Sequence, residues 1–172
     1  GILMSYFSQS YEKIFNCSII NGKLSLNYEP ILLTEMIKRD PDLPEKDEFL
    51  SLLVSTILEP PDEKQYKIAA KCLKKIVASF DINAQIELAT HICEVIFDPS
   101  YFKLIRSNYL ILSAMLKEKN PLENRIQIAQ IVSEILNPFP DRILKDYIGS
   151  ICKLTGFVIG TIGPNLPDNI KE

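Results

Sequence analysis

The sequence predicts an all-α fold in which antiparallel helix pairs stack as a short right-handed α-solenoid, with a small N-terminal β-hairpin or extended loop. Three observations predict this fold. Apolar residues recur at helical spacing through most of the chain. Prolines and helix-capping side chains stand at the helix starts. These starts fall near residues 62, 82, 99, 121 and 140, so every second start lies about 40 residues further on, which is the period of a two-helix repeat.

The composition is that of a globular protein of ordinary size. The chain has 172 residues, of which 47% are hydrophobic and 24% are charged, and its formal net charge is -3. These values exclude both a disordered chain and a strongly basic nucleic-acid-binding domain. We expect one domain over residues 1–172, made of a helix plus hairpin (1–28), helical repeats (29–163) and an extended tail (164–172). Gly1 in place of an initiator methionine indicates a fragment of a longer protein.

The N-terminal region changes its hydrophobic period after about residue 16. Over residues 5–16, apolar residues at helical spacing predict a short amphipathic helix; they are Tyr6, Phe7, Tyr11, Ile14 and Phe15. Asn21-Gly22 then separates two short runs that favour β-structure. Because a type I′ turn needs positive φ at both central residues, this pair predicts a hairpin.

Five further helices are predicted from their start signals. Proline is tolerated in the first turn of a helix, and Asp or Asn caps the free N–H groups there. These signals predict helix starts at Pro30, Pro44, Asp62, Asp81 and Asn120-Pro121. The first of these helices is expected to end near Arg39 and the third near Ser79. In the last one, the residues expected to face inward are Leu122, Ile126, Ala129, Val132 and Leu136.

The stretch from Asp98 to Lys119 is predicted to be the central helix. It is apolar on nearly all sides, so neighbours must bury it from several directions, with Leu112 in the core. Asp98 is a suitable N-cap, and Pro99 suits the first helical position. Lys117 and Lys119 stand where the helix dipole favours cations. We therefore expect one buried helix over the whole stretch.

The C-terminal stretch from Tyr147 to Ile162 differs in composition, because it combines apolar residues with several glycines. A further helix is expected from about residue 140. Glycine in a helix interior costs up to about 1 kcal/mol, so we expect this helix to end or break near Thr155-Gly156. The extended tail follows.

The helical pattern resembles HEAT or armadillo-type repeats over roughly residues 44–160. The resemblance rests on helix length, repeat period and apolar spacing. It implies stacked helix pairs whose surface binds a partner, and therefore a scaffold or adaptor that binds another protein. A compact, irregular helical domain is the alternative fold.

The most distinctive surface feature is a run of lysines whose spacing places them on one side of a predicted helix. The residues of this lysine strip are Lys64, Lys67, Lys71, Lys74 and Lys75. Apolar residues such as Tyr66 and Leu73 fall on the opposite side. We interpret the strip as a docking surface for an acidic peptide or another protein. The alternatives are nucleic acid or an anionic membrane as the partner, or a solvated face with none.

Residues that support catalysis are scarce in this sequence. His91 is the single histidine, and Glu87 and Glu94 share its helix face, which suits either general-base chemistry or a solvated polar face. The chain has neither a phosphate-binding glycine loop nor a nucleophile elbow. We therefore predict no enzymatic activity, no metal and no cofactor.

The cysteines are widely spaced and form no C-x-x-C pair; they are Cys17, Cys72, Cys93 and Cys152. Free thiols in a reducing compartment are expected, with disulfides or a metal site as the alternative. We therefore predict an intracellular protein, in the cytoplasm or the nucleus. No apolar run reaches the roughly 20 residues that a membrane span needs.

An acidic run surrounds the predicted helix start at Pro44; its carboxylates are Asp40, Asp42, Glu45, Asp47 and Glu48. Carboxylates are stabilised at a helix N-terminus by the helix dipole, which is the structural interpretation of the run. A second interpretation is that the run neutralises the lysine strip.

Overall fold

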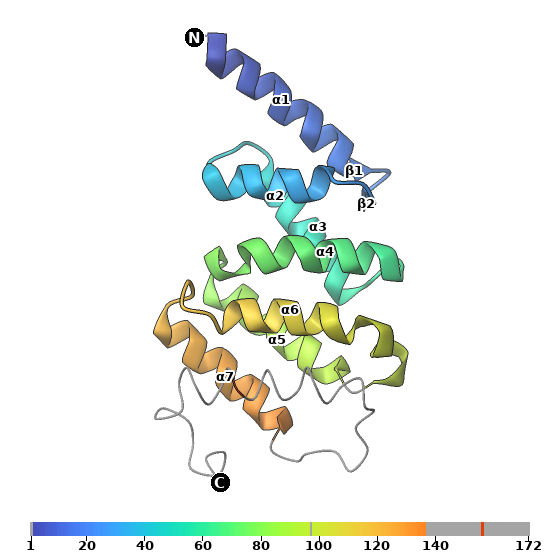
Figure 1. Ribbon diagram of the computed structural model, residues 1–172, viewed down its shortest axis with the longest axis vertical. Helices are drawn as coiled ribbons and strands as arrows, with labels where there is room; N and C mark the ends of the chain where they lie inside the picture. Colours follow the sequence, from blue (N-terminus) through green and yellow to red (C-terminus); the bar gives the residue numbers. More distant parts are fainter. Residues whose placement is uncertain (1, 97, 137–155, 157–172) are drawn as a thin grey trace. The chain divides into compact units, whose positions relative to one another are not determined.

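The computed structural model describes residues 2–96, 98–136 and 156, whose helices and strands are drawn in Figure 1. These residues contain seven α-helices, two 3₁₀ helices and a two-stranded hairpin, so the prediction of a mostly helical fold with an N-terminal hairpin is confirmed. The chain forms two compact units, Gly1–Ile76 (unit 1) and Val77–Glu172 (unit 2). Each unit is described by itself, and the single domain stays a prediction.

Unit 1 contains four α-helices and the hairpin. Its elements are α1 (Ile2–Ser18), β1 (Ile19–Ile20), β2 (Lys23–Leu24), α2 (Glu29–Arg39), α3 (Lys46–Leu58) and α4 (Glu63–Ile76). The helix predicted over residues 5–16 is confirmed and is slightly longer than expected. The predicted starts at Pro30 and Asp62 fall within one residue of the observed helices, whereas α3 begins two residues after Pro44.

The hairpin has the turn that the sequence predicts. Ile19 pairs with Leu24 and Ile20 with Lys23 in an antiparallel ladder. Asn21 and Gly22 both have positive φ, 53° and 76°, as a type I′ turn requires. A two-stranded hairpin is marginal in water by itself, so it needs support from helices. Here α1, α3 and α4 contact the strands, and the buried Leu24 provides the apolar contact.

The core of unit 1 comes from one face of each helix. α2 packs against both α1 and α4, and α4 also packs against α3. Figure 1 shows α2 and α4 lying side by side and running in the same direction. The fully buried side chains at these contacts are Leu33, Phe49, Leu53, Ile57, Tyr66 and Leu73. Burial of each such side chain contributes about 1.5–3 kcal/mol, which holds the four helices together.

Unit 2 contains three described α-helices and two 3₁₀ helices. They are η1 (Val77–Ser79), α5 (Ile82–Val95), η2 (Pro99–Leu104), α6 (Ile105–Met115) and α7 (Leu122–Leu136). The Asp81 cap is confirmed, because its side chain accepts a 2.9 Å hydrogen bond from the backbone N–H of Ala84. The predicted end near Ser79 is correct, although the last three residues are 3₁₀ rather than α-helical.

The predicted central helix is wrong at both ends. Residues Pro99–Leu104 form a 3₁₀ helix, and α6 begins only at Ile105. The Asp98 carboxylate accepts hydrogen bonds from the N–H and the hydroxyl of Ser100, and these local bonds compete with the α-helical ladder. At the other end the helix stops at Met115, because the N–H of Leu116 bonds back three residues to Ser113.

Burial of the central helix is confirmed. Every residue from Ile111 to Leu116 is buried, and Leu112 has no exposed surface. Its exposed residue, Arg106, stands in the first turn, and Tyr109 and Leu110 in the second turn are half-buried. α6 is therefore covered on almost all sides, as its composition predicts.

A buried polar network joins the start of α5 to the turn between α6 and α7. Gln85 and Asn120 have no exposed surface, and the Asn120 amide donates to Gln85 Oε1 and to the Met115 carbonyl, both at 2.7 Å. Gln85 Nε2 donates to the Phe80 carbonyl at 3.0 Å. Arg125 Nε donates to the Asn120 carbonyl at 2.9 Å. The network fixes this junction, while α5 packs on α7 through apolar side chains.

One residue of α7 does not face inward as predicted. Leu122 was predicted to face inward but is 47% exposed, because it stands in the first turn of α7, before Ile128, Ala129 and Val132 enter the core. The predictions for the helix from about residue 140 and for the tail at 164–172 lie outside the described residues. Gly156 itself is helical.

Candidate functional site

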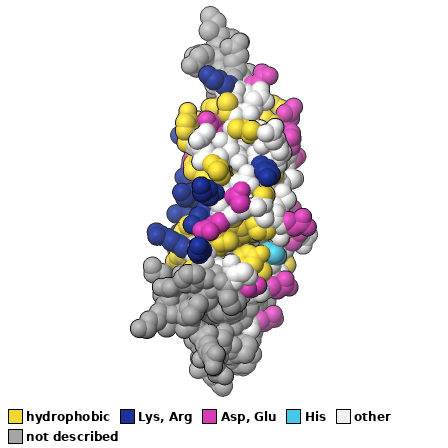
Figure 2. All heavy atoms as spheres, turned by 90° about the vertical axis from the view of Figure 1, so that its right-hand side faces the viewer, with side chains coloured by type: hydrophobic (Ala, Val, Ile, Leu, Met, Phe, Trp, Pro, Cys, Tyr) yellow, Lys and Arg dark blue, Asp and Glu magenta, His cyan; other side chains and the backbone are white. Residues whose placement is uncertain are grey.

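The lysine strip lies on α4, and all five of its lysines are exposed. The opposite side of the helix is buried, since Tyr66, Ala69 and Leu73 have no exposed surface. At about 100° per residue, the five lysines cover an arc of roughly 100°. Figure 2 shows Lys and Arg side chains grouped at the surface, apart from most acidic ones. The predicted geometry of the strip is therefore confirmed.

Two lysines of the strip pair with a carboxylate. Lys67 Nζ lies 2.8 Å from Glu63 Oε1, one turn earlier on α4. Lys75 Nζ lies 2.7 Å from Glu35 Oε1 on α2. The hydrogen bond from Lys75 lowers the pKa of Glu35. Both pairs are partly exposed, so each contributes little to stability.

The other three lysines of the strip make no ion pair within residues 2–96 and 98–136; they are Lys64, Lys71 and Lys74. Lys64 and Lys71 are seven residues apart, or about 10.5 Å along the helix axis. Lys74 stands within one turn of Lys71 on the same side. The strip thus presents three uncompensated positive charges from a helix that is held rigidly by its buried face.

The acidic run lies in the loop before α3 and in its first turn. Asp47 and Glu48 occupy the first turn of α3, where the helix dipole favours them. The structural interpretation of the run is therefore confirmed for these two residues. The second interpretation is not supported, because the ion pairs found on the lysine strip go to Glu63 and Glu35.

His91 lies on α5 with the carboxylates of Glu87 and Glu94 on the same helix. It is half-buried on α5, and its Nε2 is buried without a hydrogen-bond partner among the described residues. Glu87 and Glu94 are exposed. No hydrogen bond or ion pair joins either carboxylate to His91 in the part of the chain that the structure describes.

Three of the four cysteines are free thiols, and the fourth, Cys152, lies outside the described residues. Burial raises the pKa of Cys72 to about 11 and that of Cys93 to about 12. A thiol with such a pKa stays protonated at neutral pH and is a poor nucleophile and a poor metal ligand. Cys72 and Cys93 are therefore core residues rather than reactive ones.

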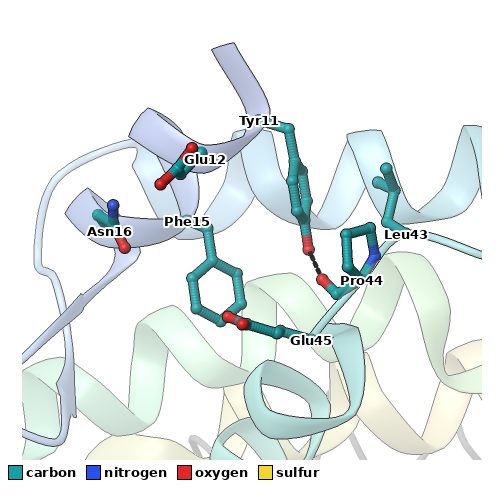
Figure 3. A pocket seen from close by; sticks show the side chains of 7 residues that line it. All are labelled: Tyr11, Glu12, Phe15, Asn16, Leu43, Pro44 and Glu45. Carbon is teal, nitrogen blue, oxygen red and sulfur yellow. Dashed lines mark hydrogen bonds between the residues drawn. The ribbon is translucent and has the colours of Figure 1, made fainter. Parts of the chain in front are cut away.

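Sequence reasoning missed a cavity in unit 1. A hollow of about 400 Å³ lies between α1 and the loop that joins α2 to α3 (Figure 3). Its lining residues are Tyr11, Glu12, Phe15, Asn16, Leu43, Pro44 and Glu45. A second hollow, of about 390 Å³, shares Glu12 and Asn16 with the first and extends it along α1 to Lys13 and Cys17. The hydrogen bond that closes the first cavity joins Tyr11 to Pro44, which are 33 residues apart. The sequence pattern near each residue therefore did not indicate the cavity, apart from the aromatic pair Tyr11 and Phe15 on α1.

The described residues offer no ready site for a metal. No group of three or more His, Cys, Asp or Glu side chains in residues 2–96 and 98–136 is arranged to hold an ion. Among the same residues, no helix has the length and hydropathy that a membrane span requires. Comparisons with protein-family models, with curated proteins and with solved structures find no match to this chain.

Proposed function

We propose that the protein is a non-enzymatic scaffold or adaptor that works inside the cell and binds an acidic segment of another protein through the lysine strip. We further propose that its helices form a right-handed solenoid of two-helix repeats of the HEAT or armadillo type. The first proposal depends on the charges of α4, and the second depends on the packing order of the helices.

The packing order within each unit supports the repeat. In a stack of two-helix repeats, each helix packs against the helix two places further along the chain. α2 packs against α4 in unit 1, and α5 packs against α7 in unit 2. The first pair also runs in the same direction, as equivalent helices of successive repeats do. The free, buried thiols Cys72 and Cys93 support a reducing compartment.

The observation that carries the binding proposal is the presence, on one exposed face, of three lysines that form no ion pair with any described residue. Lys71 and Lys74 are three residues apart, and like charges at this spacing repel one another by several tenths of a kcal/mol. A partner that brings carboxylates to Lys64, Lys71 and Lys74 removes this repulsion and adds charge-assisted hydrogen bonds. The helix needs no rearrangement to bind, because its opposite face is already packed.

Nucleic acid and anionic membranes are the second class of candidate, since they also carry dense negative charge. Two observations favour a protein partner instead. The exposed face of the strip has no aromatic side chain on which a base would stack. The whole chain has a net charge of -3, which disfavours long-range attraction to a polyanion.

The test compares three ligands with one pair of variants. Fluorescence anisotropy measures binding of a labelled Glu/Asp-rich peptide, a labelled single-stranded RNA, and vesicles containing phosphatidylserine. We expect the peptide to bind best and Lys71→Glu/Lys74→Glu to weaken it about tenfold or more. The control Lys117→Glu/Lys119→Glu makes the same charge change at two exposed lysines of unit 2.

Two outcomes would reject the proposal. If RNA or vesicles bind more tightly than the peptide, with affinity falling steeply as salt rises, the strip is a polyanion site. If the control variant weakens peptide binding as much as Lys71→Glu/Lys74→Glu, the effect comes from net charge and the strip is a solvated face.

A further inference from the structure

The cavity between α1 and the α2–α3 loop has a chemistry opposite to that of the lysine strip. Tyr11 and Phe15 face it from successive turns of α1, and Leu43 and Pro44 form its other apolar wall. The remaining lining residues are polar: the carboxylates of Glu12 and Glu45 and the side-chain amide of Asn16. Figure 3 shows Tyr11 pointing from α1 toward Pro44 of the loop, and the Phe15 ring lying beside the Glu45 side chain.

The cavity is held in shape by contacts within unit 1. The Tyr11 hydroxyl donates a hydrogen bond to the Pro44 carbonyl, which fastens the loop to α1. The Tyr11 and Phe15 rings pack at a centroid distance of 6.0 Å with a tilt of 46°. Both aromatic residues are at least nine-tenths buried, so their positions are fixed. A site that is already formed requires little ordering when a ligand binds.

Two carboxylates line the cavity, and no cation lines it among the described residues. Glu12 and Glu45 are both exposed, and neither forms an ion pair within the described residues. Lys46, the first residue of α3 and the chain neighbour of Glu45, donates to the carbonyl of Pro41 instead. Burial, together with the charge of Glu45, raises the pKa of Tyr11, so this carboxylate acts on the aromatic wall.

We propose that this cavity binds the side chain of an arginine presented by a partner protein. A guanidinium group stacks on aromatic rings and hydrogen-bonds to carboxylate and amide oxygens, and the apolar stem of arginine fits beside Leu43 and Pro44. An anion would be repelled by Glu12 and Glu45. An apolar side chain would contact Leu43 and Pro44 but would make no use of the two carboxylates.

Size also fits the proposed occupant. A volume of about 400 Å³ exceeds that of one side chain, and the adjoining hollow along α1 provides room for the peptide on either side of it. Lys13 lines only this second hollow, so it does not oppose the guanidinium in the first. The site is separate from the lysine strip and does not depend on the function proposed for that strip.

The test uses small probes and the full 172-residue chain. ¹H–¹⁵N spectra are recorded during titration with N-acetyl-arginine amide, N-acetyl-lysine amide and N-acetyl-citrulline amide, the last being an uncharged mimic of arginine. We expect the arginine probe to shift the signals of residues 11–16, of Leu43 and of Glu45 in a saturable way. The lysine probe should bind more weakly, and the citrulline probe should cause no saturable shift.

Matched variants then test the carboxylates. We expect Glu45→Gln to weaken the arginine probe about threefold to fivefold, as loss of one partly exposed charge pair predicts. Glu59→Gln removes the same charge at the other end of α3 and should leave the affinity unchanged. The proposal is overturned if citrulline or lysine binds as well as arginine, if shifts appear elsewhere but not at residues 11–16, or if Glu59→Gln has the effect of Glu45→Gln.

Discussion

Among the residues whose burial the structure describes, each unit has one buried glutamine, which stands in the first turn of a helix, and the two glutamines differ in their hydrogen bonds. In unit 1, Gln65 Nε2 donates to the Leu24 carbonyl at 3.1 Å, but its Oε1 is buried without a partner among the described residues. In unit 2, Gln85 is bonded at both ends, to the Phe80 carbonyl and to Asn120. The same residue type thus makes one contact in unit 1 and a network in unit 2.

The difference indicates which kind of interaction determines the structure of each unit. A buried polar atom without a partner costs about 1–3 kcal/mol, so the single bond of Gln65 is offset by its unpaired oxygen. A network whose polar atoms are all hydrogen-bonded contributes more to the free energy of unfolding, and it disfavours other arrangements of the same side chains. Unit 1 should therefore depend mainly on apolar packing, whereas the junction of α5 with the α6–α7 turn should depend on polar contacts as well.

The largest expected effect comes from the apolar core of unit 2. Leu112→Asp places a carboxylate at a position with no exposed surface, which costs several kcal/mol, so we expect loss of cooperative unfolding in urea followed by circular dichroism. Leu122→Asp is the matched control, because Leu122 is 47% exposed. A Leu112→Asp variant that unfolds like the wild type would mean that α6 is not buried.

The next effect measures the contrast between the two glutamines directly. Asn120→Ala leaves Gln85 Oε1 and the Met115 carbonyl without the amide that donates to them, so we expect the free energy of unfolding to fall by about 2–3 kcal/mol. Gln65→Ala removes its unpaired oxygen together with its one bond, so we expect a loss of about 1 kcal/mol or less. Equal losses in urea titrations would show that the Asn120 network is no stronger than the single contact.

The smallest effect concerns the exposed pair in unit 1. Lys75 lowers the pKa of Glu35 below 4.5, so the pair stabilises the fold above about that pH and loses its contribution as the pH falls through the lowered pKa. Because Glu35 is about one-third exposed, we expect Glu35→Gln to cost at most about 0.5 kcal/mol at pH 7. The cost should vanish near pH 2. Glu118→Gln is the control. If Glu35→Gln still lowers the free energy of unfolding near pH 2 by more than the control does, the ion pair is not the source of the effect.

The parts of the fold that the sequence predicts are those with local signals. Asn21-Gly22 specifies its turn by the backbone angles that the two residues tolerate, and Asp81 caps α5 through a bond three residues away. The 3₁₀ start after Asp98 was missed because the local bonds to Ser100 are as compatible with the sequence as an α-helix is. Burial of Leu122 was overestimated because periodicity does not show where a neighbouring helix ends.

The two candidate sites also differ in whether the sequence predicts them. The lysine strip follows from helical spacing alone, so its placement on α4 was predictable. The cavity was not, because it depends on a bond between Tyr11 and Pro44, which are 33 residues apart. The bond between Gln85 and Asn120 spans 35 residues and was missed for the same reason. Polar pairs at such separations leave no periodic trace in a single sequence.

Glu45 has a left-handed backbone, with φ of 62° and ψ of 10°, which costs a residue with a Cβ about 1–2 kcal/mol compared with glycine. A library screened for heat resistance should therefore enrich Glu45→Gly. The same substitution deletes a carboxylate from the cavity wall. Glycine at position 45 would therefore favour thermostability, and glutamate would favour arginine binding. Selection for thermostability alone would remove the proposed arginine site.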